Sequence, residues 1–476
     1  MSWQIKKRVQ VLESNKHFFE YDGKPVWLSG HSRIWTLTSF LKPSYEPVDR
    51  LANPDVNVAS RKRTYIDETE RVAESGGHLM RITPFWPGHW AEGIALPWKQ
   101  VEPGKFDLRE FDEKYFADFR EFLGKAAEND IIVQMELWDR PGLSHWHATR
   151  WPRHPFNPVF NVNYGANVLP DHTGPAVKNV VFGKKLFYRS VHGENPQLLE
   201  YQQIYIDKLL DECAPFPNVI YCIENEGTGG ARWETFWANR IRSRIPDALI
   251  TAMPLNPSDN TWKSYFEPPF SCLDGGGTGL RIATHGASQS HESLDDGARS
   301  RTDMLTQISH VLELYYLYMQ YNPQKTMPIY VSNSFGALRD NIWAMFCCGA
   351  AGHRYHRNCY DPAETCYRWV SVFNKFLTET QVPFWTMEPR RDLLRGHGMC
   401  LANDRVAVVY IPNSKAVSFA PEKHDTVLKL RFMDADTGAW LGEEEKPIVR
   451  FEDGIADFVE IHGKNETGTV VYCQRQ

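Results

Sequence analysis

The chain has 476 residues, of which 42% are hydrophobic and 24% charged, an ordinary balance for a folded protein. Its 53 basic and 59 acidic residues give a formal net charge of −6, and no run of Lys and Arg exceeds three residues, so we expect no nucleic-acid partner. Residues 341–352 form the longest apolar stretch, which is too short to cross a membrane.

The amino-terminal segment, residues 1–8, has no apolar signal core, and the nine cysteines have no regular spacing. This pattern predicts a cytoplasmic protein without a disulfide framework. An exported form whose signal has been removed would have the same pattern.

Short β-rich runs alternate with helical runs as far as about residue 380. Helical spacing is clearest at residues 110–128, 196–213, 231–245, 302–321, 341–352 and 367–380. The expected strands cover residues 26–31, 78–83, 131–138, 218–226, 248–253, 270–274, 327–333 and 353–357. Eight β/α pairs predict an α/β protein built as a (β/α)8 TIM barrel.

Beyond residue 390 the pattern changes to strands and turns only. Strands are expected at residues 405–411, 427–432, 456–461 and 469–472, with turns at 436–438 and 452–454. We therefore predict two domains, a barrel over residues 1–388 and a small C-terminal antiparallel β-sandwich over residues 389–476.

Polar residues occupy inward or upper-rim positions on the expected barrel strands, where Val, Ile and Leu are usual. Because burying unpaired charge is costly, a set of this kind predicts a functional site. The set comprises Arg81, Glu136, Glu224, Glu226, Asp274, Asn333 and His356, with Trp138 and Asp139 just above.

The dipeptide Asn225-Glu226 closes the fourth expected strand. Glycoside hydrolysis needs a carboxylic acid that protonates the leaving oxygen and usually a second carboxylate as nucleophile or base. The dipeptide is similar to the Asn-Glu signature of the clan A barrel glycosidases. That resemblance implies that Glu226 is the acid/base and that Asn225 binds the sugar hydroxyl beside the cleaved bond. We also expect neighbouring groups, Glu224 if ionised, to raise the pKa of Glu226. Arg81 is similar to the active-site arginine of the clan.

The order of the two domains carries a second resemblance. A barrel that begins near Asp22-Gly-Lys-Pro25, ends with Gly349-Ala-Ala-Gly352-His353 and precedes a sandwich resembles apiosidase-like enzymes. In those enzymes a collagen-binding-type β-sandwich follows the barrel.

The seventh strand departs from the clan pattern, because it reads Tyr330-Val-Ser-Asn333-Ser where the clan has its nucleophilic Glu. Four explanations remain open: an inverting enzyme with its base elsewhere, a relocated nucleophile, an engineered replacement, or a barrel that only binds carbohydrate. The candidates for a second carboxylate are Asp274, Glu224 and Asp139. Each has a purely structural alternative: a loop turn for Asp274, an ion pair with Arg81 for Glu224, and a contact with Arg140 for Asp139.

Aromatic residues make up 13% of the chain and recur in the expected βα loops. Aromatic rings stack on sugar faces while Asn, Asp and Arg bind hydroxyls, although single loop aromatics often pack onto the barrel instead. The expected substrate-binding residues are Asn225, Arg81, Trp35, Glu136, Trp138, Asp139, Asn333 and His356.

Neither His353-Arg-Tyr-His356 nor His145-Trp-His147 matches a metal-site spacing, so we expect no metal and no cofactor. The sequence predicts a glycoside hydrolase acting on an oligo- or polysaccharide, with Glu226, Asp274 and Glu224 as candidate catalytic residues. The alternative is a non-catalytic carbohydrate-binding barrel, and the oligomeric state stays open.

Overall fold

A computed structural model describes most of the chain. The described residues are 5, 7–31, 65–84, 96–140, 151, 154–170, 185–254, 262–275, 327–334, 339–355, 363–412, 415–422, 426–450, 452 and 457–476. None of the helices within these ranges is both long and apolar enough to span a bilayer.

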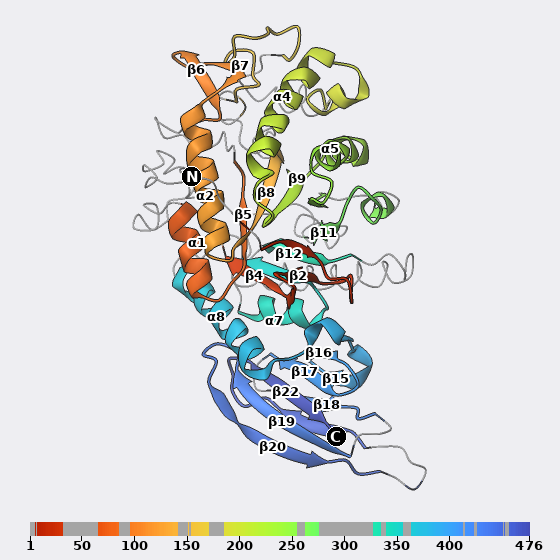
Figure 1. The fold of residues 1–476 in the computed structure, drawn as a ribbon. Helices are drawn as coiled ribbons and strands as arrows, with labels where there is room; N and C mark the ends of the chain where they lie inside the picture. Colours follow the sequence, from red (N-terminus) through yellow and green to blue (C-terminus); the bar gives the residue numbers. More distant parts are fainter. Residues whose placement is uncertain are drawn as a thin grey trace, which may run out of the picture.

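Eight parallel strands form one nearly closed sheet in which neighbours along the chain are neighbours in space (Figure 1). The predicted (β/α)8 barrel is confirmed. Its strands are β4 (Leu28–His31), β5 (Leu79–Ile82), β8 (Ile132–Asp139), β9 (Val219–Asn225), β10 (Leu249–Ala252), β11 (Cys272–Asp274), β12 (Ile329–Ser334) and β13 (Gly352–Tyr355).

The first and second strands of the barrel, β4 and β5, approach each other very closely. The amide of His78, just before β5, donates to the carbonyl of Ser29 at 2.7 Å. A Cβ atom on Gly30 would lie 1.8 Å from the carbonyl oxygen of Leu79, so only glycine fits there. This backbone approach brings the two edges of the sheet together.

The described helices lie outside the strands. Helix α2 shows how the sequence sets such a helix: Asp112 caps it by accepting from the amides of Lys114 and Tyr115, and Phe116 and Phe119 are buried on one face. The helices are α1 (Tyr65–Glu74), α2 (Glu113–Glu128), α4 (Pro196–Cys213), α5 (Ala231–Arg244), α7 (Asp340–Cys347) and α8 (Ala363–Thr380). The helix expected at 302–321 lies outside the described residues.

A hairpin that the sequence did not predict precedes α2. Strands β6 (Trp98–Glu102) and β7 (Lys105–Phe111) pair antiparallel, so the prediction that the helix begins at Glu110 is wrong. The hairpin lies beside α4, at the end of the molecule opposite the C-terminal sheets (Figure 1).

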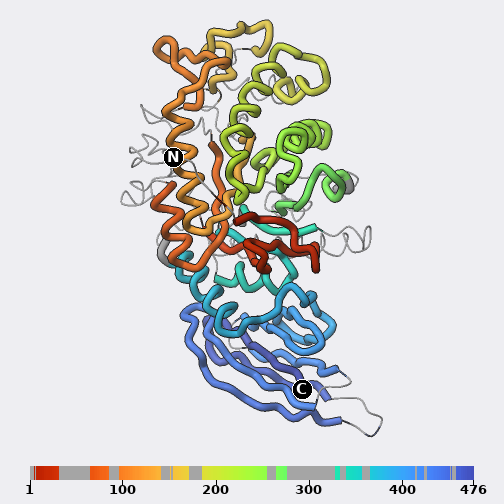
Figure 2. Tube along the Cα trace, in the orientation of Figure 1, coloured from red at the N-terminus to blue at the C-terminus, as the bar shows by residue number. Residues whose placement is uncertain are grey.

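The amino-terminal strands β1 (Val9–Val11), β2 (Phe19–Tyr21) and β3 (Lys24–Val26) close one end of the barrel. Phe19 packs edge-on against Tyr330 with ring centroids 5.7 Å apart, and it shares an apolar cluster with the first residues of several barrel strands, Leu79, Ile132 and Leu249 among them. Figure 2 shows this red segment against the teal strands. We call this closed end the floor and the opposite end, where the strands finish, the mouth.

The C-terminal part consists of two antiparallel sheets that share one apolar cluster, which includes Phe419, Phe432 and Ile461. The predicted antiparallel sheets are present, while their description as a sandwich domain and the boundary between residues 388 and 389 stay predictions. The larger sheet contains β14 (Glu388–Pro389), β16 (Met399–Ala402), β17 (Val406–Ile411), β22 (Thr469–Arg475), β19 (Val427–Asp434) and β20 (Trp440–Pro447), and the smaller one β15 (Leu394–Gly396), β18 (Ala416–Phe419) and β21 (Val459–His462).

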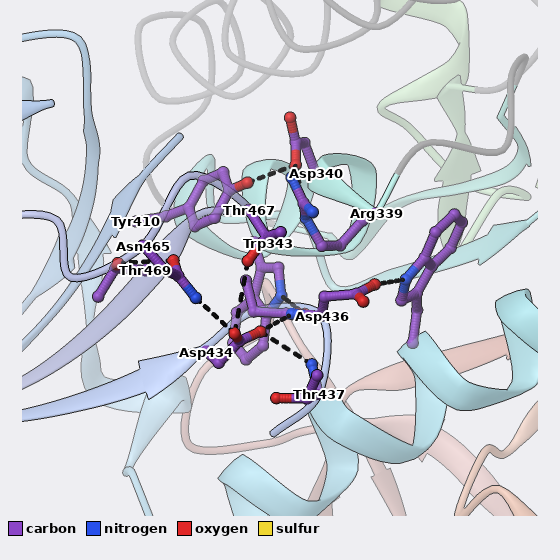
Figure 3. A network of polar contacts seen from close by, with 12 residues as sticks. Arg339, Asp340, Trp343, Tyr410, Asp434, Asp436, Thr437, Asn465, Thr467 and Thr469 are labelled. Atoms are coloured by element: carbon purple, nitrogen blue, oxygen red, sulfur yellow. Dashed lines mark hydrogen bonds and ion pairs between the residues drawn. The ribbon is translucent and has the colours of Figure 1, made fainter. Parts of the chain in front are cut away.

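The larger sheet packs on α7 and α8 of the barrel (Figure 3). Trp343 on α7 stacks on Tyr410 of β17, and its indole N–H donates to the carbonyl of Ala435 at 3.4 Å. The Tyr410 hydroxyl donates to Asp340. The side chain of Asp434 accepts from the amide of Asp436 at 2.8 Å and so shapes the loop that meets Trp343. Apolar contact and directed hydrogen bonds together join the two parts.

Candidate active site

The candidate site lies at the mouth, where β8 and β9 end side by side. Asp139 is in register with Asn225, whose side-chain N–H donates to the Asp139 carboxylate at 2.7 Å. One residue further along both strands, Arg140 donates to Glu226 in an ion pair. The last residue of β8 and the residue after it thus pair with the last residue of β9 and the residue after it.

Arg81 on β5 supports this arrangement from below. Its guanidinium donates to the carboxylate of Glu136 and to the side-chain oxygen of Asn225, and the Thr83 hydroxyl donates to Glu136 at 2.7 Å. Arg81 and Glu136 are almost completely buried. Burial raises the pKa of Glu136 to about 7, although the Arg81 and Thr83 bonds act in the opposite direction.

Glu226 follows the last residue of β9 and has a φ of 48°. The left-handed region is uncommon for residues other than glycine, and such conformations concentrate at functional positions. The next amide, that of Gly227, donates to the carbonyl of Met253 beyond β10 at 2.8 Å. The Glu226 side chain stays 14% exposed, the most accessible of the carboxylates in this group.

Glu224, two residues before Glu226, has different bonding partners. Its carboxylate accepts from the hydroxyl of Tyr188 in η6 (Tyr188–His192) at 2.8 Å and from the amide of Thr228 at 3.2 Å. It is completely buried, and burial raises its pKa to about 7. The ion pair with Arg81 that the sequence suggested is wrong, because Arg81 is bonded to Glu136 and Asn225 instead.

Trp138 is also placed away from the mouth. Its ring contacts Phe187, Trp233 and Trp237 in the layer between strands and helices, with only 3% of the residue exposed. Glu136 faces Arg81 inside the barrel and Trp138 faces outside, so the strict two-residue alternation of side chains breaks between them. The same break on β9 lies between Cys222, which is near Arg81 and Glu136, and Glu224, which bonds to Tyr188.

Asp274 lies deeper and is completely buried. It accepts from the side-chain N–H of Gln134 at 2.9 Å and from the amide of Ser332 at 3.1 Å, and Tyr330 donates to Gln134 at 2.7 Å. These contacts tie β8, β11 and β12 together beneath the Arg81 layer. The loop turn expected for Asp274 stays a prediction, because the loop lies outside the described residues from residue 276 on.

The other residues predicted from the sequence lie partly outside and partly within the described ranges. Trp35 and His356 lie outside the described residues, and of Asn333 the structure describes only its place in β12. Trp98, one of the aromatic residues of the expected βα loops, packs on Phe156 and Tyr205 in the core instead. Arg140 was not among the expected site residues, although its place directly after Asp139 at a strand end was the available signal. Within the described ranges no three His, Cys, Asp or Glu residues gather as metal ligands do.

Comparisons with known proteins agree with this geometry at the level of the fold. Residues 61–247 match a family described as a domain of unknown function (DUF6298), and no curated protein matches the chain. The whole chain superposes on a glycoside hydrolase with a TM-score of 0.61 and 11% identity, over 98% of that protein. It superposes equally completely on a family 5 glycoside hydrolase from Bacteroides vulgatus with a TM-score of 0.59 and 11% identity, over 95% of that chain. The chain therefore has the fold of these glycoside hydrolases.

Proposed function

We propose that this protein is a glycoside hydrolase that cleaves an oligo- or polysaccharide, with Glu226 as the general acid. The observation that carries the proposal is the pairing of Asp139-Arg140 with Asn225-Glu226 at the mouth. It presents a partly exposed carboxylate, a neighbouring carboxylate, an amide and a guanidinium on one rim, as sugar binding and acid–base catalysis require.

Asp139 is our choice for the second carboxylate. The other two candidates are engaged elsewhere, Glu224 with Tyr188 and Thr228, and Asp274 with Gln134 and Ser332. In the proposed inverting step Asp139 takes a proton from water, whose oxygen bonds to the anomeric carbon. The glycosidic C–O bond breaks as the leaving oxygen takes the proton of Glu226. Asn225 and Arg81 orient the sugar.

An isosteric variant tests the role of Glu226. Glu226→Gln should lower turnover of an oligosaccharide by about 10²–10⁴-fold, because an alcohol leaving group needs a proton. The loss on 2,4-dinitrophenyl glycosides should be much smaller, because dinitrophenolate leaves without protonation. The wild type is first assayed on a panel of both substrate types. An equal loss on the two types would contradict the acid role.

The stereochemistry of the product tests Asp139. NMR of the first product formed should show the inverted anomer, and Asp139→Asn should abolish hydrolysis while saccharide binding persists. Retention of configuration would instead indicate a relocated nucleophile.

A non-catalytic carbohydrate-binding barrel is the second candidate, favoured by Asn333 at the position of the clan nucleophile. Saccharide binding without hydrolysis of any glycoside in the panel would support it. The apiosidase-like subtype, the collagen-binding-type character of the sandwich and a cytoplasmic location remain parts of our proposal that rest on the sequence.

A further inference from the structure

The chain turns around the carboxylate of Glu224 immediately after β9. One oxygen accepts from the Tyr188 hydroxyl at 2.8 Å, and the other accepts from the amide of Thr228 at 3.2 Å. The amide of Gly229 also bonds to this carboxylate. A side chain two residues before Glu226 is thus bonded to the backbone two and three residues after it.

The turn enclosed in this way contains the unusual backbone of Glu226. Gly227 leaves no spare room, since a Cβ atom there would lie 3.2 Å from the Glu224 carboxylate and 2.4 Å from that of Glu234. On its other side the turn is bonded to β10 through Gly227 and Met253. The direction of the Glu226 side chain is therefore fixed from two sides.

Groups from several elements face the Glu224 carboxylate. Tyr188 comes from η6, Arg140 from the end of β8, and Glu234 from α5. Tyr265 of η7 (Trp262–Tyr265) bonds to Glu234, and Lys185 donates to the carbonyl of Thr228 at 3.3 Å. Among these described groups, the buried guanidinium of Arg140 favours the charged form of Glu224, whereas Lys185 is exposed.

We propose that Glu224 is a positioning residue: its ionised carboxylate holds the turn of residues 225–229 and thereby aims Glu226 into the mouth. The inference rests on the proposed acid role of Glu226 but concerns a residue that contacts no substrate. Nothing in the Asn-Glu pattern requires a carboxylate two residues before the acid.

Because the Glu224 carboxylate must be ionised to hold the turn of residues 225–229, the site should be sensitive to pH. Burial raises the pKa of Glu224 to about 7, although Tyr188, Arg140 and the backbone amides favour its charged form. Amides bond more strongly to a carboxylate than to a carboxylic acid. The hold therefore weakens as the pH falls below about 7, and turnover should decline on the acid side.

Three variants with one control test this hold. Glu224→Leu removes the acceptor, Glu224→Gln keeps its shape without the charge, and Tyr188→Phe removes one donor. Glu68→Gln is the matched control, because Glu68 is also a buried carboxylate bonded by a tyrosine, Tyr367 at 2.5 Å, but lies on α1. The substrate is an oligosaccharide that the wild type cleaves, because its alcohol leaving group needs the proton of Glu226.

Glu224→Leu should lower kcat about 10–100-fold with KM nearly unchanged. Glu224→Gln should have a kcat between those of Glu224→Leu and the wild type, and its pH profile should lack the decline of kcat below about pH 7, which we call the acid limb. Tyr188→Phe should move that limb to higher pH, because the lost bond favours the charged form. Glu68→Gln should leave the profile as in the wild type. An unchanged acid limb in both Glu224→Gln and Tyr188→Phe would overturn the proposal.

Hydrogen exchange separates this proposal from the proposed function. Peptides covering residues 225–229 should exchange faster in Glu224→Leu than in Glu68→Gln. If the wild type hydrolyses no glycoside but this difference in exchange is present, the proposed hydrolase function is contradicted and the proposed positioning role of Glu224 is supported. Equal exchange in the two variants would overturn the hold whatever the activity.

Discussion

At the scale of single residues, the region behind Glu226 carries buried carboxylates whose pKa values are strongly perturbed. Glu234 on α5 is completely buried, and burial, followed by the charge of Glu224, raises its pKa to about 8 from an ordinary value of 4.5. Because its folded pKa is raised, the stability that it contributes is complete below about pH 4.5 and is lost as the pH rises through about 8.

This linkage predicts the effect of Glu234→Gln. Thermal unfolding of the wild type should show stability falling between pH 5 and pH 9, with Glu234 accounting for on the order of 4 kcal/mol of the decline. The variant carries no charge there, so its decline should be shallower by that amount. Glu128→Gln, at the exposed end of α2, should follow the wild-type curve. Parallel curves for all three proteins would contradict the assignment.

The candidate site was predictable from the positions of the strand ends. Arg81, Glu136, Asp139 and Asn225 meet as expected because the carboxyl ends of adjacent parallel strands share one edge of the barrel. Glu224 and Trp138 were misplaced because the two-residue alternation of side chains breaks on both β8 and β9, and no feature of the local sequence marks the break. The bonding partners of Glu224 come from η6 and from the turn itself, which only the folded chain brings together.

At the scale of elements, the barrel depends on the close approach of β4 and β5. Gly30→Ala would place a methyl group 1.8 Å from the carbonyl oxygen of Leu79, and backbone on both sides prevents relief. We expect a loss of more than about 3 kcal/mol in the free energy of unfolding, measured by denaturant titration, or failure to fold.

Gly165→Ala is the matched control for this variant. Gly165 is exposed, and the nearest atom to an added Cβ would be the side-chain oxygen of Asn167 at 3.3 Å, which can rotate away. Its effect should stay within about 0.5 kcal/mol. Similar denaturant midpoints for the two variants would show that β4 and β5 can move apart without loss of stability.

The order of strands and helices followed from the sequence, because each βα unit buries its own apolar face. The β6–β7 hairpin did not, since Phe111 and Tyr115 continue the helical spacing of α2 backwards into β7. Long-range pairing decides this segment: the amide of Phe106 donates to the carbonyl of Phe160 at 2.9 Å, from a loop more than fifty residues later.

At the scale of the whole molecule, Trp343 joins the barrel to the C-terminal sheets. It is fully buried between Phe373, Phe376 and Tyr410. Trp343→Ala should cost about 3–5 kcal/mol and divide a single calorimetric unfolding transition into two. Tyr410→Phe, which removes only the hydroxyl bonded to Asp340, should cost about 1 kcal/mol and keep one transition. A single transition at the wild-type temperature in Trp343→Ala would show that this contact does not couple the unfolding of the barrel to that of the C-terminal sheets.

The floor formed by β1–β3 limits the directions from which a ligand can approach Glu226. Phe19 lies on Tyr330 and apolar side chains fill that end, so the described residues leave no path to Glu226 through the floor. Under the proposed function, both the substrate and the product would therefore reach and leave Glu226 from the side of the mouth. Product inhibition that rises in step with substrate affinity across a series of saccharides is the behaviour expected when both use that side.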